Sequence, residues 1–365
     1  MKKLLALVLA GAMAISMVAC SSKTEPAPAP AGDDEPLRVL LIATALGDKS
    51  FNDSADAGLK RAEADFGIEY TIIEYGNDNS KVEPTLQEAA EDGYDIITCN
   101  DLGFGMASTW LNEHAAEYPD TLFVLYDVPT ETVTADNVLL MAYTANEADF
   151  LAGALAAMKS ESGVIGFVGG QETPVIWDFL VGYIEGAKYV NPDIKVAVSY
   201  VGGYTDPAKG KELGNAAIDL GADVLHGVAG SSGNGTLEAA KDAGKLGIGV
   251  DSDQYAVFKD QQPELAASII TSSLKEVGNS LYTVIKEKLD GTFAIEGERR
   301  WFGMDGNYVG LAENENYLAL TTEEERAAID DIKAKMASGE IKVDTAYGME
   351  TATLNDLVAS VAPAQ

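Results

Sequence analysis

The chain has 365 residues, of which 47% are hydrophobic and 23% are charged, and this composition suits a globular α/β protein with two domains of roughly 150 residues each. Lys and Arg total 25 against 58 Asp and Glu, which gives a formal net charge of −33. Such a surface repels a phosphate backbone, which argues against nucleic acid as a partner.

The N-terminus has the layout of a secretory signal. Two lysines precede an apolar run over 4–15 that is too short to span a bilayer, and residues 16–20 (SMVAC) match the bacterial lipoprotein signal. We therefore expect 1–19 to be a signal peptide and Cys20 to be lipidated, which places the protein on the extracytoplasmic side of a bacterial cell membrane. The alternative is a plain signal peptide with an incidental cysteine. The Ala-Pro-rich residues 20–36 predict a flexible tether.

From Arg38 onward, strands and helices alternate as they do in βαβ units. The first strand, at 39–43, is apolar throughout, which is typical of a strand covered on both faces of a parallel sheet. The further elements expected in the first half are strands at 69–75, 95–99, 121–126 and 138–143 and helices at 54–66, 82–92 and 106–117.

The second half repeats this alternation. Its expected strands are 163–168, 194–201, 222–226, 246–250 and 266–272; its expected helices are 146–160, 175–190, 208–220, 236–243, 274–289, 322–337 and 352–360. The Gly-rich stretch 229–235 is expected to be a loop.

These elements predict two doubly wound parallel-sheet domains joined by a hinge, whose loops meet in one central ligand cleft. Because the tail is longer than the second domain needs, we expect the chain to recross the hinge. The predicted first lobe is 37–145 plus about 270–310, and the predicted second lobe is 146–269 plus about 311–365.

The loop at 47–53 (GDKSFND) places short polar side chains and Phe51 where a strand ends and a helix begins. In doubly wound folds, ligands bind at such a position. The alternative is an ordinary loop in which Asp53 or Ser54 caps the helix and Phe51 lies in the core.

Several motifs together resemble the basic membrane protein family, the PnrA-like substrate-binding lipoproteins of ABC importers. They occur in family order at 47–53, 151–157 (LAGALAA), 165–187 (IGFVGGQETPVIWDFLVGYIEGA), 200–211 (YVGGYTDPAKGK) and 250–275. The resemblance implies a type I periplasmic-binding-protein-like fold, a purine nucleoside as ligand, an ABC permease as partner and a monomer.

The resemblance also implies roles for individual residues. Two aromatic side chains sandwich the purine: Phe51, with Asp48, Ser50 and Asn52 beside it, and Tyr204, for which Trp177 is a second candidate. Asp127 reads the N–H edge of the base. Asp251 and Lys275 hold the sugar hydroxyls, and Gly230 permits close approach of the backbone.

One position departs from the family pattern, since many relatives carry an acidic residue at the end of the first strand, where this chain reads Leu41-Ile42-Ala43-Thr44. This departure leaves a different sugar pose or a different ligand open, and a flavin or a sugar is the alternative to a nucleoside.

An enzyme is not expected, because the sequence has only two histidines, His114 and His226, and no G-x-S-x-G, P-loop lysine or H-E-x-x-H motif. A nucleoside-cleaving enzyme is the weakest alternative. We expect neither a metal nor a cofactor.

Overall fold

The computed structural model describes residues 35–76, 78–101 and 105–364. The predicted signal peptide, the lipidation site Cys20 and the tether up to residue 34 lie outside the described residues. Over the described ranges, no helix combines the length and the apolar character that crossing a bilayer requires.

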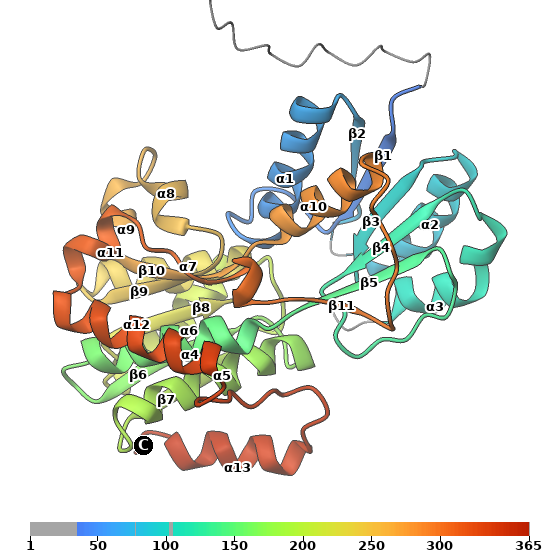
Figure 1. The fold of residues 1–365 in the computed structure, drawn as a ribbon. Coiled ribbons are helices and arrows are strands. Elements are labelled where there is room, and N and C mark those ends of the chain that lie inside the picture. The colour runs from blue at the N-terminus through green and yellow to red at the C-terminus, as the bar shows by residue number, and fades with distance from the viewer. Residues whose placement is uncertain (1–34, 77, 102–104, 365) are drawn as a thin grey trace, which may run out of the picture. The chain divides into compact units, whose positions relative to one another are not determined.

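The first lobe is built on a six-stranded parallel sheet with the strand order β11-β5-β4-β3-β1-β2 (Figure 1). Its strands are β1 (Arg38–Ala43), β2 (Glu69–Glu74), β3 (Ile96–Asn100), β4 (Leu122–Tyr126), β5 (Val138–Tyr143) and β11 (Arg300–Phe302). Its helices are α1 (Phe51–Phe66), α2 (Val82–Glu91), α3 (Met106–His114) and α10 (Val277–Leu289), with 3-10 turns at Asn79–Lys81 and Ala115–Glu117.

The second lobe has a six-stranded sheet with the order β12-β10-β9-β8-β6-β7, in which only β12 runs antiparallel. Its strands are β6 (Val164–Gly169), β7 (Lys195–Tyr200), β8 (Val224–Val228), β9 (Leu246–Asp251), β10 (Ile269–Lys275) and β12 (Val309–Leu311). Its helices are α4 (Ala145–Lys159), α5 (Pro174–Val190), α6 (Pro207–Asp219), α7 (Ser231–Asp242), α8 (Gln254–Phe258), α9 (Pro263–Ser268), α11 (Glu315–Leu320), α12 (Glu323–Ser338) and α13 (Thr351–Val361), with a 3-10 turn at Met304–Gly306.

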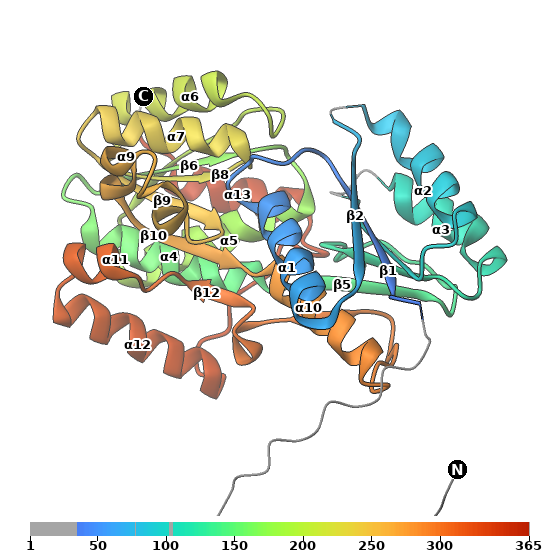
Figure 2. The ribbon, with the colours of Figure 1, turned by 90° about the horizontal axis from the view of Figure 1, so that it is seen from above.

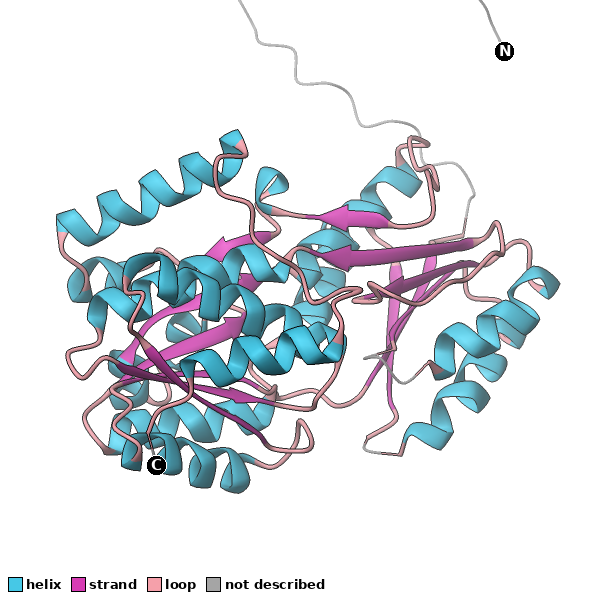
Figure 3. Ribbon diagram, turned by 90° about the horizontal axis from the view of Figure 1, so that it is seen from below, coloured by secondary structure: helices cyan, strands magenta, loops and turns pink. Residues whose placement is uncertain are grey.

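The first five strands of each lobe follow the same order, 2-1-3-4-5, which confirms two doubly wound domains. Helices lie on both sides of each sheet (Figure 3). Strand β1 shows why: Val39 and Leu41 pack into the core on one face, and Leu40 and Ile42 pack into the core on the other. A strand buried on both faces needs apolar residues at every position, as this one has.

The chain crosses between the lobes after β5, after β10 and between β11 and β12. Strand β10 pairs with β9 and β12, so residues 270–275 belong to the second sheet, whereas the predicted boundary near 270 assigned them to the first lobe. The helix that follows, α10, packs beside α1 of the first lobe (Figure 2).

The Gly-rich stretch 229–235 was expected to be a loop, yet α7 already begins at Ser231. Gly235 of this stretch serves a helix–helix contact instead. A Cβ on Gly235 would lie 1.9 Å from the backbone oxygen of Pro207, and one on Gly210 would lie 1.9 Å from that of Ser232. Helices α6 and α7 therefore approach backbone to backbone, which outweighs the poor helix propensity of glycine.

Candidate ligand-binding site

A cavity of about 290 Å³ lies between the two lobes, at the carboxyl ends of their strands. This is where open α/β sheets place their ligands. Its lining residues are Thr44, Ala45, Leu46, Gly47, Asp48, Phe51, Asn52 and Asp127 from the first lobe and Val175, Ile176, Phe179, Tyr204, Thr205, Val228, Ala229, Gly230, Ser231, Asp251 and Lys275 from the second.

Lys275 is the electrostatic centre of this cavity. It is the last residue of β10 and is 3% exposed, and its Nζ donates to Asp127 Oδ2 at 2.7 Å and lies 3.6 Å from Asp251 Oδ1. Burial by itself would lower the pKa of Lys275, but the two carboxylates outweigh that effect and raise it. The ammonium group therefore stays charged and links an acid of the first lobe to an acid of the second.

Asp251 ends β9, and its carboxyl group is strongly perturbed by burial. Burial raises its pKa to about 6, although the charge of Lys275 and a hydrogen bond from Ser50 Oγ both lower it. Because Ser50 belongs to the first lobe, this hydrogen bond also crosses the cleft. A carboxyl group in this state can accept hydrogen bonds from hydroxyl groups of a ligand near neutral pH.

Aromatic rings form the walls around the ammonium group. The Lys275 Nζ lies 4.7 Å from the centroid of the Phe51 ring and 4.9 Å from that of Phe179. Phe51 also contacts Tyr126, with 5.6 Å between ring centroids. Tyr204 lines the cavity from the second lobe, and burial raises the pKa of its phenol, which is therefore neutral at physiological pH. The cavity thus offers flat apolar faces beside a charged cluster.

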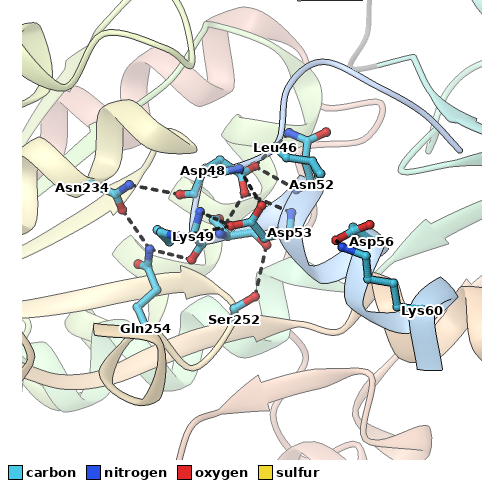
Figure 4. Close-up of polar contacts among 12 residues, drawn as sticks. Leu46, Asp48, Lys49, Asn52, Asp53, Asp56, Lys60, Asn234, Ser252 and Gln254 are labelled. Atoms are coloured by element: carbon cyan, nitrogen blue, oxygen red, sulfur yellow. Dashed lines mark hydrogen bonds and ion pairs between the residues drawn. The ribbon is translucent and has the colours of Figure 1, made fainter. Parts of the chain in front are cut away.

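Carboxylates hold the first-lobe loop that faces the cavity (Figure 4). The Asp48 side chain accepts hydrogen bonds from the backbone N–H groups of Ser50, Asn52 and Asp53 and from Asn52 Nδ2, at 2.8 to 3.1 Å. Burial raises the pKa of Asp48, and these hydrogen bonds partly offset the effect. Four donors on one carboxylate fix the positions of Phe51 and Asn52 before a ligand arrives.

Backbone strain marks the same place. Among the described residues, the non-glycine positions with a left-handed φ are Lys49 (62°), Asp127 (62°), Asp251 (61°) and Asn307 (57°), and the first three lie at the cleft. Such conformations cost of the order of 1–3 kcal/mol each and gather at functional sites. At Asp127 and Asp251 the strained backbone directs a carboxylate into the cavity.

Most of the predicted site residues meet in this cavity: Asp48, Phe51, Asn52, Asp127, Tyr204, Gly230, Asp251 and Lys275 all line it. Ser50 does not line the cavity, but its hydroxyl group donates a hydrogen bond to Asp251, which does. Trp177 does not line it, because its position on α5 turns it toward a separate cluster with Val181 and Leu354. The aromatic residue that α5 presents to the cavity is Phe179, which the sequence reasoning missed.

His226 has a structural setting away from the cavity. It is fully buried, its Nε2 lies 3.2 Å from both Asp149 carboxylate oxygens, and its Nδ1 lies 3.1 Å from the backbone oxygen of Ile248. These contacts join α4, β8 and β9 inside the second lobe.

Comparison with known proteins gives consistent matches over nearly the whole chain. Residues 37–345 match the family described as ABC transporter substrate-binding protein PnrA-like. Basic membrane protein A of Borreliella burgdorferi is 31% identical over 317 residues, covering 86% of this chain and 88% of that protein. The ABC transporter nucleoside-binding protein BmpA of Lactococcus lactis is 32% identical over 271 residues, covering 70% of this chain and 75% of that protein.

Among solved structures, a solute-binding protein of an ABC transporter system from Aeropyrum pernix K1 superposes with a TM-score of 0.76 at 26% identity. The match covers 89% of this chain and 98% of the other.

Proposed function

Because the chain belongs to the family of PnrA-like ABC transporter substrate-binding proteins, we propose that it captures a purine nucleoside between its two lobes and delivers it to a membrane permease. The relative from Lactococcus lactis that is named a nucleoside-binding protein supports this choice of ligand. The observation that carries the proposal is the combination of aromatic walls and a buried charged cluster in one cavity of about 290 Å³.

The aromatic walls suit the base. Phe51 from the first lobe and Tyr204 from the second line the same cavity, and a stacked base gains about 1–3 kcal/mol from an aromatic partner whichever base it is. A volume near the lower end of the range for small-molecule sites, about 300–1,000 Å³, favours a nucleoside over the larger flavin. Asp127 accepts from the N–H edge of the base in this arrangement.

The charges favour a nucleoside over a nucleotide. Among the described residues that line the cavity, Lys275 is the only cation, whereas Asp48, Asp127 and Asp251 are acidic. A phosphate group would meet this excess of carboxylates, but sugar hydroxyls and base N–H groups are donors that carboxylates accept. The proposed sugar-binding pair is therefore Asp251 with Lys275.

The proposal also covers where the protein is anchored in the cell. Cys20 carries a lipid that anchors the chain on the extracytoplasmic face, and the permease receives the ligand there. The protein releases the nucleoside chemically unchanged, so prolonged incubation with inosine should give no free base by chromatography.

A thermal-shift panel tests the ligand: guanosine, inosine, adenosine, uridine, guanosine 5′-monophosphate, riboflavin, ribose and glucose. At a ligand concentration of 100 times Kd, binding should stabilise the fold by about 2.7 kcal/mol. We expect the purine nucleosides to raise the Tm and the monophosphate to do so far less. A shift with glucose alone, or with riboflavin alone, would refute the nucleoside assignment.

A further inference from the structure

Three successive backbone carbonyl groups of the first lobe, at residues 48–50, are each bound by a side chain of the second lobe (Figure 4). Asn234 Nδ2 donates to the first carbonyl, Gln254 Nε2 to the second and Ser252 Oγ to the third, each at 3.1 Å. These hydrogen bonds span about 200 residues of sequence and bridge the cleft beside the cavity.

Two of the second-lobe partners, Asn234 and Gln254, are bound to one another. Gln254 is 1% exposed, its Nε2 also donates to Asn234 Oδ1 at 3.0 Å, and its Oε1 accepts from the Val250 backbone N–H at 3.1 Å. The Gln254 backbone N–H donates to Ser272 Oγ at 3.1 Å. Both amide side chains are therefore oriented within the second lobe, independently of the first.

The first-lobe partner is equally rigid. Lys49 holds a left-handed φ of 62°, and the Asp53 carboxylate accepts from the backbone N–H groups of Gly47 and Lys49 at 2.7 and 3.0 Å. A strained loop held from within presents its carbonyl groups in one fixed arrangement. Two rigid surfaces that complement one another lose little conformational entropy when they meet.

The cavity and these hydrogen bonds use different sides of the same loop. Asp48 and the neighbouring Phe51 and Asn52 line the cavity, whereas Asn234 and Gln254 do not line it and donate to backbone oxygens of the first-lobe loop. We propose that Asn234, Ser252 and Gln254 form a closure latch, which holds the lobes together and raises ligand affinity without touching the ligand. Because the latch binds carbonyl groups of the protein itself, it strengthens the binding of every ligand by the same factor. The latch rests on closure of the two lobes and not on the identity of the ligand.

Isosteric acids test the latch with little change in shape. Gln254→Glu keeps the acceptor for the Val250 N–H but removes both donors, and Asn234→Asp removes the donor to the first carbonyl while keeping the acceptor for Gln254. The control is Gln261→Glu, which adds the same charge at an exposed position of the same lobe. Urea unfolding of each ligand-free variant shows that it is folded.

Calorimetry with guanosine and with inosine gives the first readout. We expect Gln254→Glu to weaken both affinities by about tenfold, since a buried carbonyl loses its donor and faces a carboxylate, and Asn234→Asp to weaken both by about fivefold. The ratio of the two affinities should stay at the wild-type value, and the control should match the wild type. Unchanged affinity in a folded Gln254→Glu variant would overturn the latch, and so would a changed ratio, which would indicate direct contact with the ligand.

A second readout needs no ligand. Spin labels at Glu88→Cys on α2 and Asn215→Cys on α6, both exposed positions, report the distance between the lobes in a Cys20→Ser chain. We expect the ligand-free wild type to populate a short distance that Gln254→Glu loses and Gln261→Glu keeps. Identical distance distributions would overturn the latch. If the wild type bound neither nucleoside, the proposed ligand would fail, and the distance distributions would still decide the latch.

Discussion

Replacing Lys275 with methionine should destabilise the ligand-free protein severely near neutral pH. The ammonium group is 3% exposed, donates to Asp127 at 2.7 Å and lies 3.6 Å from Asp251. Methionine preserves most of the apolar stem. It removes the ammonium group beside the Phe51 and Phe179 rings and so leaves two buried carboxyl groups without their cation.

Removing one partner of a buried ion pair costs about 3–5 kcal/mol, because the charge that remains is uncompensated. Two acids share this cation, so we expect the free energy of unfolding at pH 7.5 to fall by an amount toward the upper end of that range. At pH 5 the decrease in the free energy of unfolding should be smaller. The pKa of Asp251 is already raised to about 6 in the folded wild type, and loss of Lys275 raises it further. An acid whose pKa rises on folding takes up a proton more readily in the folded state, so acidification favours the folded variant.

Urea unfolding at pH 7.5 and pH 5 measures both effects. Lys286→Met is the matched control, since that lysine is exposed and pairs with Asp290 one helical turn away; it should leave the midpoint unchanged. A loss below about 1 kcal/mol for Lys275→Met at pH 7.5 would refute the idea that this cation neutralises the site. A loss that grew at pH 5 would refute the assigned role of Asp251.

Three further changes test other parts of the molecule. Cys20→Ala should abolish lipidation, and a wild-type N-terminal peptide without lipid by mass spectrometry would contradict the predicted anchor. His226→Gln should cost about 2–3 kcal/mol in urea unfolding, because a glutamine cannot reach Asp149 and the backbone acceptor together; a loss under about 1 kcal/mol would show that the buried pair matters little. Asp251→Ala should weaken guanosine binding by about tenfold to more than a hundredfold but leave guanine nearly unaffected, whereas Phe51→Ala should weaken both; equal losses for Asp251→Ala in calorimetry would remove that residue from the sugar.

Local sequence patterns predicted most of the helices and strands. They failed where a strand forms only because it pairs with a remote segment of the chain. The strand at 138–143 was predicted at its observed bounds, because a continuous apolar run indicates a strand that is buried on both faces. Strands β11 and β12 have three residues each and no distinctive pattern; they form by pairing with β5 and β10, which are remote in sequence. Short edge strands of this kind carry no periodic signal.

The site also contains one feature that a local sequence pattern could have predicted and one that it could not. Helical spacing along α5 places Ile176, Phe179 and Tyr183 on one buried face and Trp177 off it, so a periodicity argument could have identified Phe179 as the aromatic wall. The bond between Lys275 and Asp127 joins residues 148 positions apart. Nothing in either local sequence indicates that pairing, and only the crossing of the chain between the lobes creates it.

The position of Lys275 connects ligand binding to the hinge. It is the last residue of β10, and the chain enters the first lobe two residues later at Val277. The crossing after β5 follows Tyr143, whose ring centroid lies 5.9 Å from Lys275 Nζ and whose hydroxyl hydrogen-bonds Ser280 Oγ at 2.6 Å. Two of the three crossings are thus tied together beside the charged cluster. A ligand that donates hydrogen bonds to Asp127 or Asp251 changes the forces on Lys275, and that change acts beside the crossings at which we expect the lobes to turn.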